Sequence, residues 1–139
     1  MSIDNRTTRA NAGFRDKIAM VLMLLAALGA LLAFFTAIGP ATSAGPETQH
    51  VEWWRALGFL TFALLFALLA FWPRRYPFLW EIVILNKAAL TVVGFLLMQN
   101  NAAGAASAAV ADGILTVILL AAYFLSRGYV SWRSPQALH

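Results

Sequence analysis

One apolar stretch of the chain contains side chains that could bind a ligand or transfer a proton. Residues 78–98 are long enough to span a membrane, but Glu81, Asn86 and Lys87 interrupt the apolar run. About 20 apolar residues cross a hydrocarbon core about 30 Å thick, and an unpaired ammonium near its middle costs about 3 kcal/mol or more. Lys87 therefore requires a counter-charge or a polar cavity elsewhere in the chain.

Asp112, in the last apolar stretch, is the expected counter-charge of Lys87. Lys87 and Thr91 share one helical face, because side chains four residues apart lie one above the other; Asp112 and Thr116 share a face in the same way. A flexible lysine stem can bridge two antiparallel helices, although a helical side chain leans toward its own N-terminus, which directs Lys87 away from Asp112. Arg55, which enters the second apolar stretch, is the rival partner for Asp112.

These polar residues support three interpretations, which the sequence leaves open. In the first, the charges pair only to fix helix register and neighbour order and bind no ligand. In the second, they line a polar pocket in the outer half of the membrane that holds an anionic or polar head group, or passes a proton. In the third, they form a docking face for another membrane protein. The candidate residues are Arg55, Lys87, Thr91, Asp112 and Thr116.

Glu81 belongs to a separate group near the inner membrane surface. It lies about 120° around the helix from Lys87, so the two do not form a same-face pair. We expect an inner-surface charge pair between Glu81 and Arg74 or Arg75, with Arg127 also within reach. Arg74 and Arg75 are expected to act first as an orientation signal and second as a contact for anionic lipid.

The residue types needed for covalent or metal-dependent catalysis are scarce. Cysteine is absent, and the two histidines are His50, in a predicted loop, and His139. A thiolate nucleophile and a histidine-based metal or haem site within the membrane are therefore excluded. A Ser-Lys dyad with Lys87 has no serine at matching depth. We expect no enzymatic activity, no cofactor and no metal, with a lipid-modifying enzyme as the alternative that stays open.

The composition is that of a membrane protein. The 139 residues are 61% hydrophobic and 12% charged, with a mean hydropathy of +0.73, whereas about 25% charged residues are usual in soluble domains. Because hydrocarbon forces a spanning backbone to satisfy its own hydrogen bonds, and because the connections are short, we predict an all-α, up-down-up-down bundle of four transmembrane helices. The expected spans are residues 18–39, 53–72, 78–98 and 105–126.

The remaining predictions concern the two ends of the first span and the two tails of the chain. Residues 1–17 are expected to form a mostly disordered tail, and the pair Gly39-Pro40 is expected to stop the first helix. A cleaved signal peptide is the alternative for this stretch, but its apolar run of about 22 residues exceeds the usual 7–15 or so. Residues 127–139 form the expected C-terminal tail.

The basic residues predict the orientation. The N-terminal tail contains four Lys or Arg residues, the second connection two and the C-terminal tail two, whereas the other side has only Arg55. The positive-inside rule then places both termini in the cytoplasm. Because the positive charges lie at the ends of spans and are not gathered into one patch, nucleic-acid binding is not expected.

Two short patterns resemble a known group of membrane proteins. The run Trp54–Gly58 (WRALG) opens the second span, and Val110–Gly113 (VADG) lies in the fourth. With the four short helices, they resemble small bacterial DoxX-like proteins over about residues 18–126. The resemblance implies a four-helix bundle that serves as a subunit or accessory of membrane redox systems. Glu81 and Lys87 depart from the family pattern, so no functional residue is carried over.

The sequence favours a non-enzymatic, multi-pass protein of the bacterial inner membrane that acts as an accessory or scaffold subunit. Its expected partners are membrane lipids and either another membrane protein or a second copy, because the alanine-rich residues 102–111 permit close helix contact. The alternative is a small transport or lipid- or solute-binding protein that uses a pocket of Arg55, Lys87 and Asp112.

Four glycines within the spans would also let helices approach closely: Gly29, Gly58, Gly94 and Gly113.

Overall fold

The computed structural model describes residues 2–133, with side chains from Ala10 onward. The described chain consists of α1 (Ser2–Ser43), α2 (Gln49–Phe71), α3 (Leu79–Gln99), α4 (Ala105–Ser126) and the short 3₁₀ helix η1 (Gly128–Arg133). Each of the four α-helices is long and apolar enough to cross a membrane. The predicted all-α class and the four candidate membrane spans are therefore confirmed.

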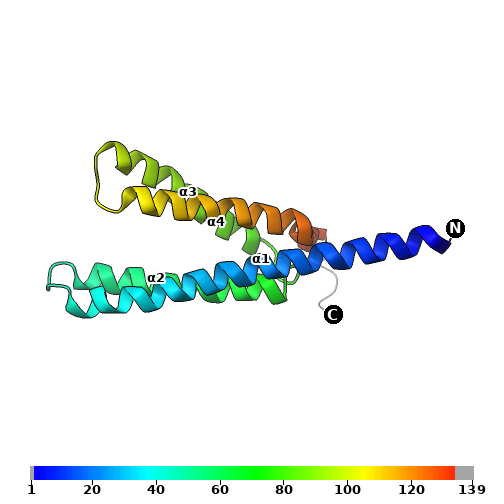
Figure 1. Ribbon diagram of the computed structural model, residues 1–139, viewed down its shortest axis with the longest axis horizontal. Coiled ribbons are helices and arrows are strands. Elements are labelled where there is room, and N and C mark those ends of the chain that lie inside the picture. The colour runs from blue at the N-terminus through cyan, green and yellow to red at the C-terminus, as the bar shows by residue number, and fades with distance from the viewer. Residues whose placement is uncertain (1, 134–139) are drawn as a thin grey trace.

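The four helices form two antiparallel hairpins, α1–α2 and α3–α4 (Figure 1). Helix α1 also packs against α4, whereas α2 and α3 hardly touch. The hairpins converge where the chain enters α1 and leaves α4, which we call the terminal end, and diverge toward the two hairpin connections, which we call the loop end (Figure 1). The arrangement is thus open on the side where a closed bundle would pack α2 against α3.

Helix α1 begins earlier than the sequence predicts. A mostly disordered tail was expected for residues 1–17, but the helix of the first span extends back to Ser2. This part of the chain contains no proline and a single glycine, Gly13, so the helix is not interrupted there. At about 1.5 Å per residue, α1 is much longer than its neighbours, and its first turns project beyond the other helices (Figure 1).

Helix α1 also ends later than predicted. Gly39-Pro40 does not stop it, because the helix continues to Ser43. A proline inside a helix removes one backbone hydrogen bond, but the hydroxyls of Thr42 and Ser43 each donate to the Gly39 carbonyl at 2.9 Å. These bonds support the last turn. The connection to α2 is consequently shorter than expected and covers only residues 44–48.

The buried core lies toward the terminal end, and all four helices contribute to it. Met23 of α1, Phe66 of α2, Trp80 of α3 and Leu119 of α4 are almost completely buried. Small residues on α1, such as Ala26, allow the neighbouring helices to approach it closely. The core therefore holds the hairpins together at the end where they converge.

Two of the four span glycines mediate contacts between α3 and α4. A Cβ added to Gly94 would lie 2.8 Å from the Cβ of Ala109, and a Cβ added to Gly113 would lie 3.5 Å from Cγ2 of Thr91. By contrast, no neighbouring atom lies within 4 Å of a Cβ added to Gly29 or Gly58. The predicted close approach at glycine thus occurs within the second hairpin only.

We expect Gly94→Ala to lower the free energy of unfolding by about 1–3 kcal/mol, because the new methyl group forces α3 and α4 apart. The measurement is an unfolding titration in mild detergent micelles. Gly29→Ala is the matched control, and its new methyl group meets open space. This control should leave stability unchanged or raise it by up to about 1 kcal/mol, since alanine favours helix. Equal losses at both positions would contradict the close contact.

Candidate functional site

Lys87 and Asp112 form an ion pair in the middle of the second hairpin. Lys87 Nζ lies 2.8 Å from Asp112 Oδ1. The Lys87 side chain is only 6% exposed and the Asp112 side chain 16%. Helical side chains tend to lean toward the N-terminus of their own helix, but the four-carbon lysine stem is long enough to reach a carboxylate on the neighbouring antiparallel helix. Each charge is thus neutralised where an unpaired one would be costly.

The ammonium of Lys87 also contacts the other hairpin. It lies 4.0 Å from the centroid of the Phe62 ring on α2, the geometry of a cation–π interaction. Phe62 in turn packs against the buried Phe66, with ring centroids 5.8 Å apart. Since α2 and α3 otherwise hardly touch, this contact is a direct link between the two hairpins.

Phe62 was not expected in the site. The sequence offers no signal for it, because a phenylalanine in an apolar span resembles any other lipid-facing or core residue. Its position over Lys87 follows only from the packing of α2 in three dimensions.

Thr91 and Thr116 lie next to the pair but direct their hydroxyls elsewhere. Thr91 Oγ1 donates to the Lys87 carbonyl at 2.8 Å, and Thr116 Oγ1 donates to the Asp112 carbonyl at 2.7 Å. Both bonds run back along the residue's own helix by one turn, a common use of threonine in helices. Both hydroxyl groups therefore donate to backbone carbonyls, and neither donates into a polar pocket.

Arg55 is not part of this site, and its predicted place in the pocket is wrong. It lies at the loop end of α2, where it pairs with Glu52 at 2.5 Å, and its side chain is 51% exposed. Helix α2 packs along α1, whereas α4 packs along α1 and α3. The start of α2 consequently does not reach Asp112, and the nearest acid is one turn away on the same helix.

Glu81 has different partners from those predicted. Its Oε1 accepts hydrogen bonds from Tyr123 Oη and Trp132 Nε1, both at 2.8 Å. Trp132 also packs edge-on against Phe78, with centroids 4.1 Å apart. Glu81 therefore connects the first turn of α3 to the end of α4 and to η1. The sequence contains a Tyr and a Trp whose polar groups need hydrogen-bond partners when buried. It does not indicate that both donate to the same carboxylate.

The predicted inner-surface pair between Glu81 and Arg74 or Arg75 is wrong. Arg74 Nη2 donates instead to Asp16 of α1, and Arg74 Nε donates to the Ser126 carbonyl at 2.7 Å. The guanidinium of Arg75 lies over its neighbour Tyr76, 5.8 Å from the ring centroid. The α2–α3 turn directs Arg74 toward α1 and the end of α4, while Glu81 faces α4 from the next helix.

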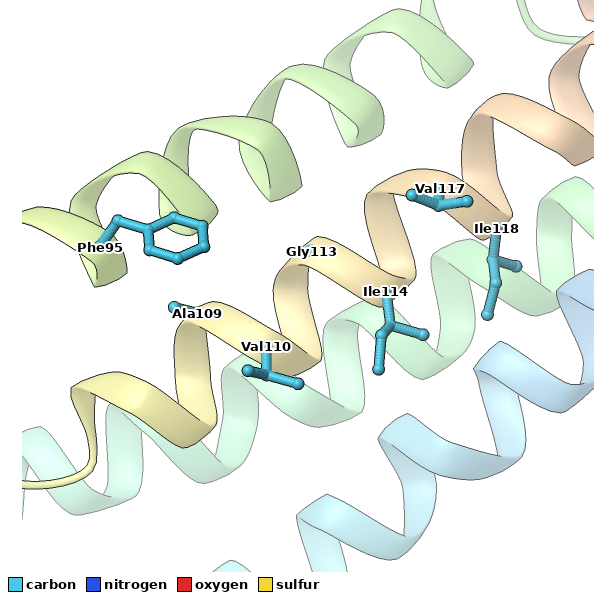
Figure 2. A pocket seen from close by; sticks show the side chains of 7 residues that line it. All are labelled: Phe95, Ala109, Val110, Gly113, Ile114, Val117 and Ile118. Carbon is cyan, nitrogen blue, oxygen red and sulfur yellow. The ribbon is translucent and has the colours of Figure 1, made fainter. Parts of the chain in front are cut away.

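An apolar groove of about 370 Å³ runs along α4, and the charge pair does not open into it. Figure 2 shows Phe95 of α3 at one edge and the branched side chains of α4 along the other. Within the part of the chain that has described side chains, no group of three His, Asp or Glu residues could hold a metal ion. The groove is lined by Phe95, Ala109, Val110, Gly113, Ile114, Val117 and Ile118.

Comparison of the chain with family models, curated proteins and solved structures finds no match. The geometry of the site is a closed, internally satisfied charge pair beside an uncovered apolar groove.

We expect Lys87→Met and Asp112→Asn each to lower the free energy of unfolding by about 3 kcal/mol, because each leaves one uncompensated buried charge. The double variant should recover much of this loss, which an unfolding titration of all four proteins would measure as a coupling energy.

Arg55→Gln serves as the control for this cycle. It breaks an exposed pair at the end of a helix and should cost less than about 1 kcal/mol. If the two single changes are harmless, or their effects simply add, the pair does not stabilise the helices.

Proposed function

We propose that the protein is a non-enzymatic accessory or scaffold subunit of a complex in the bacterial inner membrane. One observation carries the proposal. The charged groups in the middle of the spans are satisfied within the chain, while an apolar groove along α4 is left uncovered. Such a surface suits association with another apolar helix better than binding of a polar substrate.

The closed charge pair argues against a role in transport or polar-ligand binding. A ligand at Lys87 would have to displace the Asp112 carboxylate and the Phe62 ring, which leaves a charge buried without its partner. The pocket required by that alternative also included Arg55, which pairs with Glu52 at the loop end. Of the other candidate residues, Lys87 and Asp112 neutralise each other, and the hydroxyls of Thr91 and Thr116 donate to carbonyls of their own helices.

The groove has the character of a helix-packing surface. Gly113 is small and partly exposed, and branched side chains such as those of Val110, Ile114 and Val117 stand along it (Figure 2). In hydrocarbon, apolar exposure alone does not drive association, whereas close packing against small residues does. We therefore expect a transmembrane helix of a partner protein, or of a second copy, to lie along α4.

Bulky substitutions in the groove should release the partner. Ile114 and Val117 are 56% and 67% exposed, so Ile114→Trp combined with Val117→Trp should preserve the fold while it blocks the packing surface. We expect native mass spectrometry of protein extracted from its own membrane in mild detergent to show a defined complex for the unmodified chain. The blocked variant should appear as the single subunit.

Leu85→Trp is the matched control, because Leu85 is 70% exposed on α3 and does not line the groove. This variant should keep the complex. A chain that is always monomeric and without a partner, or a blocked variant that retains its complex, would contradict the scaffold proposal.

The proposal includes the orientation in which both termini face the cytoplasm. It is supported by the excess of Lys and Arg at the terminal end, where Arg15, Arg74 and Arg127 lie. The loop end carries Arg55 together with Glu47 and Glu52.

Because the chain contains no cysteine, single cysteines can test this orientation directly. We expect a membrane-impermeant maleimide to label Thr48→Cys and Ala102→Cys in intact spheroplasts, because these connections lie at the loop end. Arg75→Cys, in the α2–α3 turn, should react only after the membrane is permeabilised. The reverse pattern would contradict the orientation.

A further inference from the structure

A second cavity, of about 330 Å³, lies at the terminal end of the molecule. Residues from α1, from the α2–α3 turn and from the end of α4 with the segment after it form its wall. Three of these residues are arginines and one is an aspartate, so the lining carries a formal charge of +2. The cavity is lined by Ala12, Arg15, Asp16, Arg74, Leu125, Arg127 and Val130.

Two of the arginines are held in place by the end of α4. Arg15 Nη2 donates to the Phe124 carbonyl at 3.1 Å, and Arg74 Nε donates to the Ser126 carbonyl at 2.7 Å. Carbonyls in the last turn of a helix have no partner within the helix, and they attract cations. A guanidinium has five N–H donors, so each arginine keeps further donors after these bonds are made.

The charges in the cavity are not balanced by the side chains that the structure describes. Asp16 pairs with Arg74, which leaves Arg15 and Arg127 without a carboxylate within ion-pair distance among the residues with described side chains. Arg127 follows α4 directly and has left-handed backbone angles, with φ 54°. A cavity with this excess of guanidinium groups favours an anion, and planar guanidinium matches phosphate through two parallel hydrogen bonds.

The position of the cavity indicates the source of the phosphate. Arg15 lies just before the apolar run that begins at Ile18, and Arg127 just after the last residue of α4. The cavity therefore lies where the hydrocarbon ends and lipid head groups begin. Leu125 and Val130 add an apolar wall beside the arginines. This wall can contact the glycerol and upper acyl carbons of a lipid, whereas a free phosphate ion has no apolar part to place against it.

We propose that this cavity binds the phosphate of an anionic phospholipid from the leaflet at the terminal end. Arg15 and Arg127 contact the phosphate oxygens, and Arg74, fixed between Asp16 and the end of α4, completes the positive wall. The inference depends neither on the partner along α4 nor on which side of the membrane the terminal end faces.

The test is native mass spectrometry of the full chain in mild detergent with phosphatidylglycerol, cardiolipin and phosphatidylethanolamine added in equal amounts. We expect the unmodified protein to retain an anionic lipid in preference to phosphatidylethanolamine. Each basic residue near a membrane surface contributes about 1 kcal/mol to the binding of anionic lipid, which corresponds to about a fivefold change in affinity. The variant Arg15→Gln/Arg127→Gln should therefore bind the anionic lipid about 25-fold more weakly.

Two further variants keep the test decisive. Arg75→Gln/Arg133→Gln removes the same charge from residues that do not line the cavity, and should change the affinity by less than about twofold. Arg127→Gln alone leaves both arginine bonds to the end of α4 intact, so its fivefold loss cannot be attributed to unfolding.

Three results would overturn the proposal. In the first, the unmodified protein would show no preference for anionic lipid. In the second, the control variant would lose as much affinity as the cavity variant, which would indicate that the lipid responds to diffuse surface charge. In the third, millimolar inorganic phosphate occupies the cavity as well as the lipid does, which would make the ligand a soluble phosphate.

Discussion

A lysine in the middle of a membrane span must be neutralised, and the arrangement of this protein depends on how that is achieved. Asp112 supplies the counter-charge to Lys87 at 2.8 Å and so fixes the height of α3 against α4. The face of Phe62 covers the same ammonium from α2. One cation therefore connects three helices, and it does so across the side on which the two hairpins share little other contact. Removal of either charge would disturb the hairpins as well as the pair.

The two ends of the molecule are held by different forces. At the terminal end, polar bonds join segments that are distant in sequence: Arg74 links α1 to α4, and Glu81 links α3 to α4 and η1. At the loop end, α3 and α4 are held by the contact of Gly94 with Ala109, and the hairpins diverge (Figure 1). This contrast fits the functional proposals, since the polar end offers a charged cavity for a lipid, whereas α3 and α4 carry an open apolar groove.

The features that could be predicted from the sequence are those that follow from helical periodicity and from the free-energy cost of an unpaired charge in hydrocarbon. The four apolar helices follow from composition, and Asp112 was the expected partner of Lys87 because an unpaired lysine is unfavourable there. The errors have a common cause: periodicity gives the face on which a residue lies but not which helices are neighbours. Arg55 was expected near Asp112 because their depths match, yet α2 packs along α1. Glu81 was expected near arginine, yet its helix faces Tyr123.

The most direct test of the central pair is solid-state NMR of the protein in lipid bilayers, with ¹⁵N at lysine Nζ and ¹³C at aspartate Cγ. The chain has only two lysines, Lys17 and Lys87, so Lys17→Arg assigns the signal of the buried one. We expect a protonated Lys87 ammonium with a strong through-space contact to the ionised Asp112 carboxylate. A neutral amine at Lys87, or an ammonium without contact to Asp112, would contradict the account.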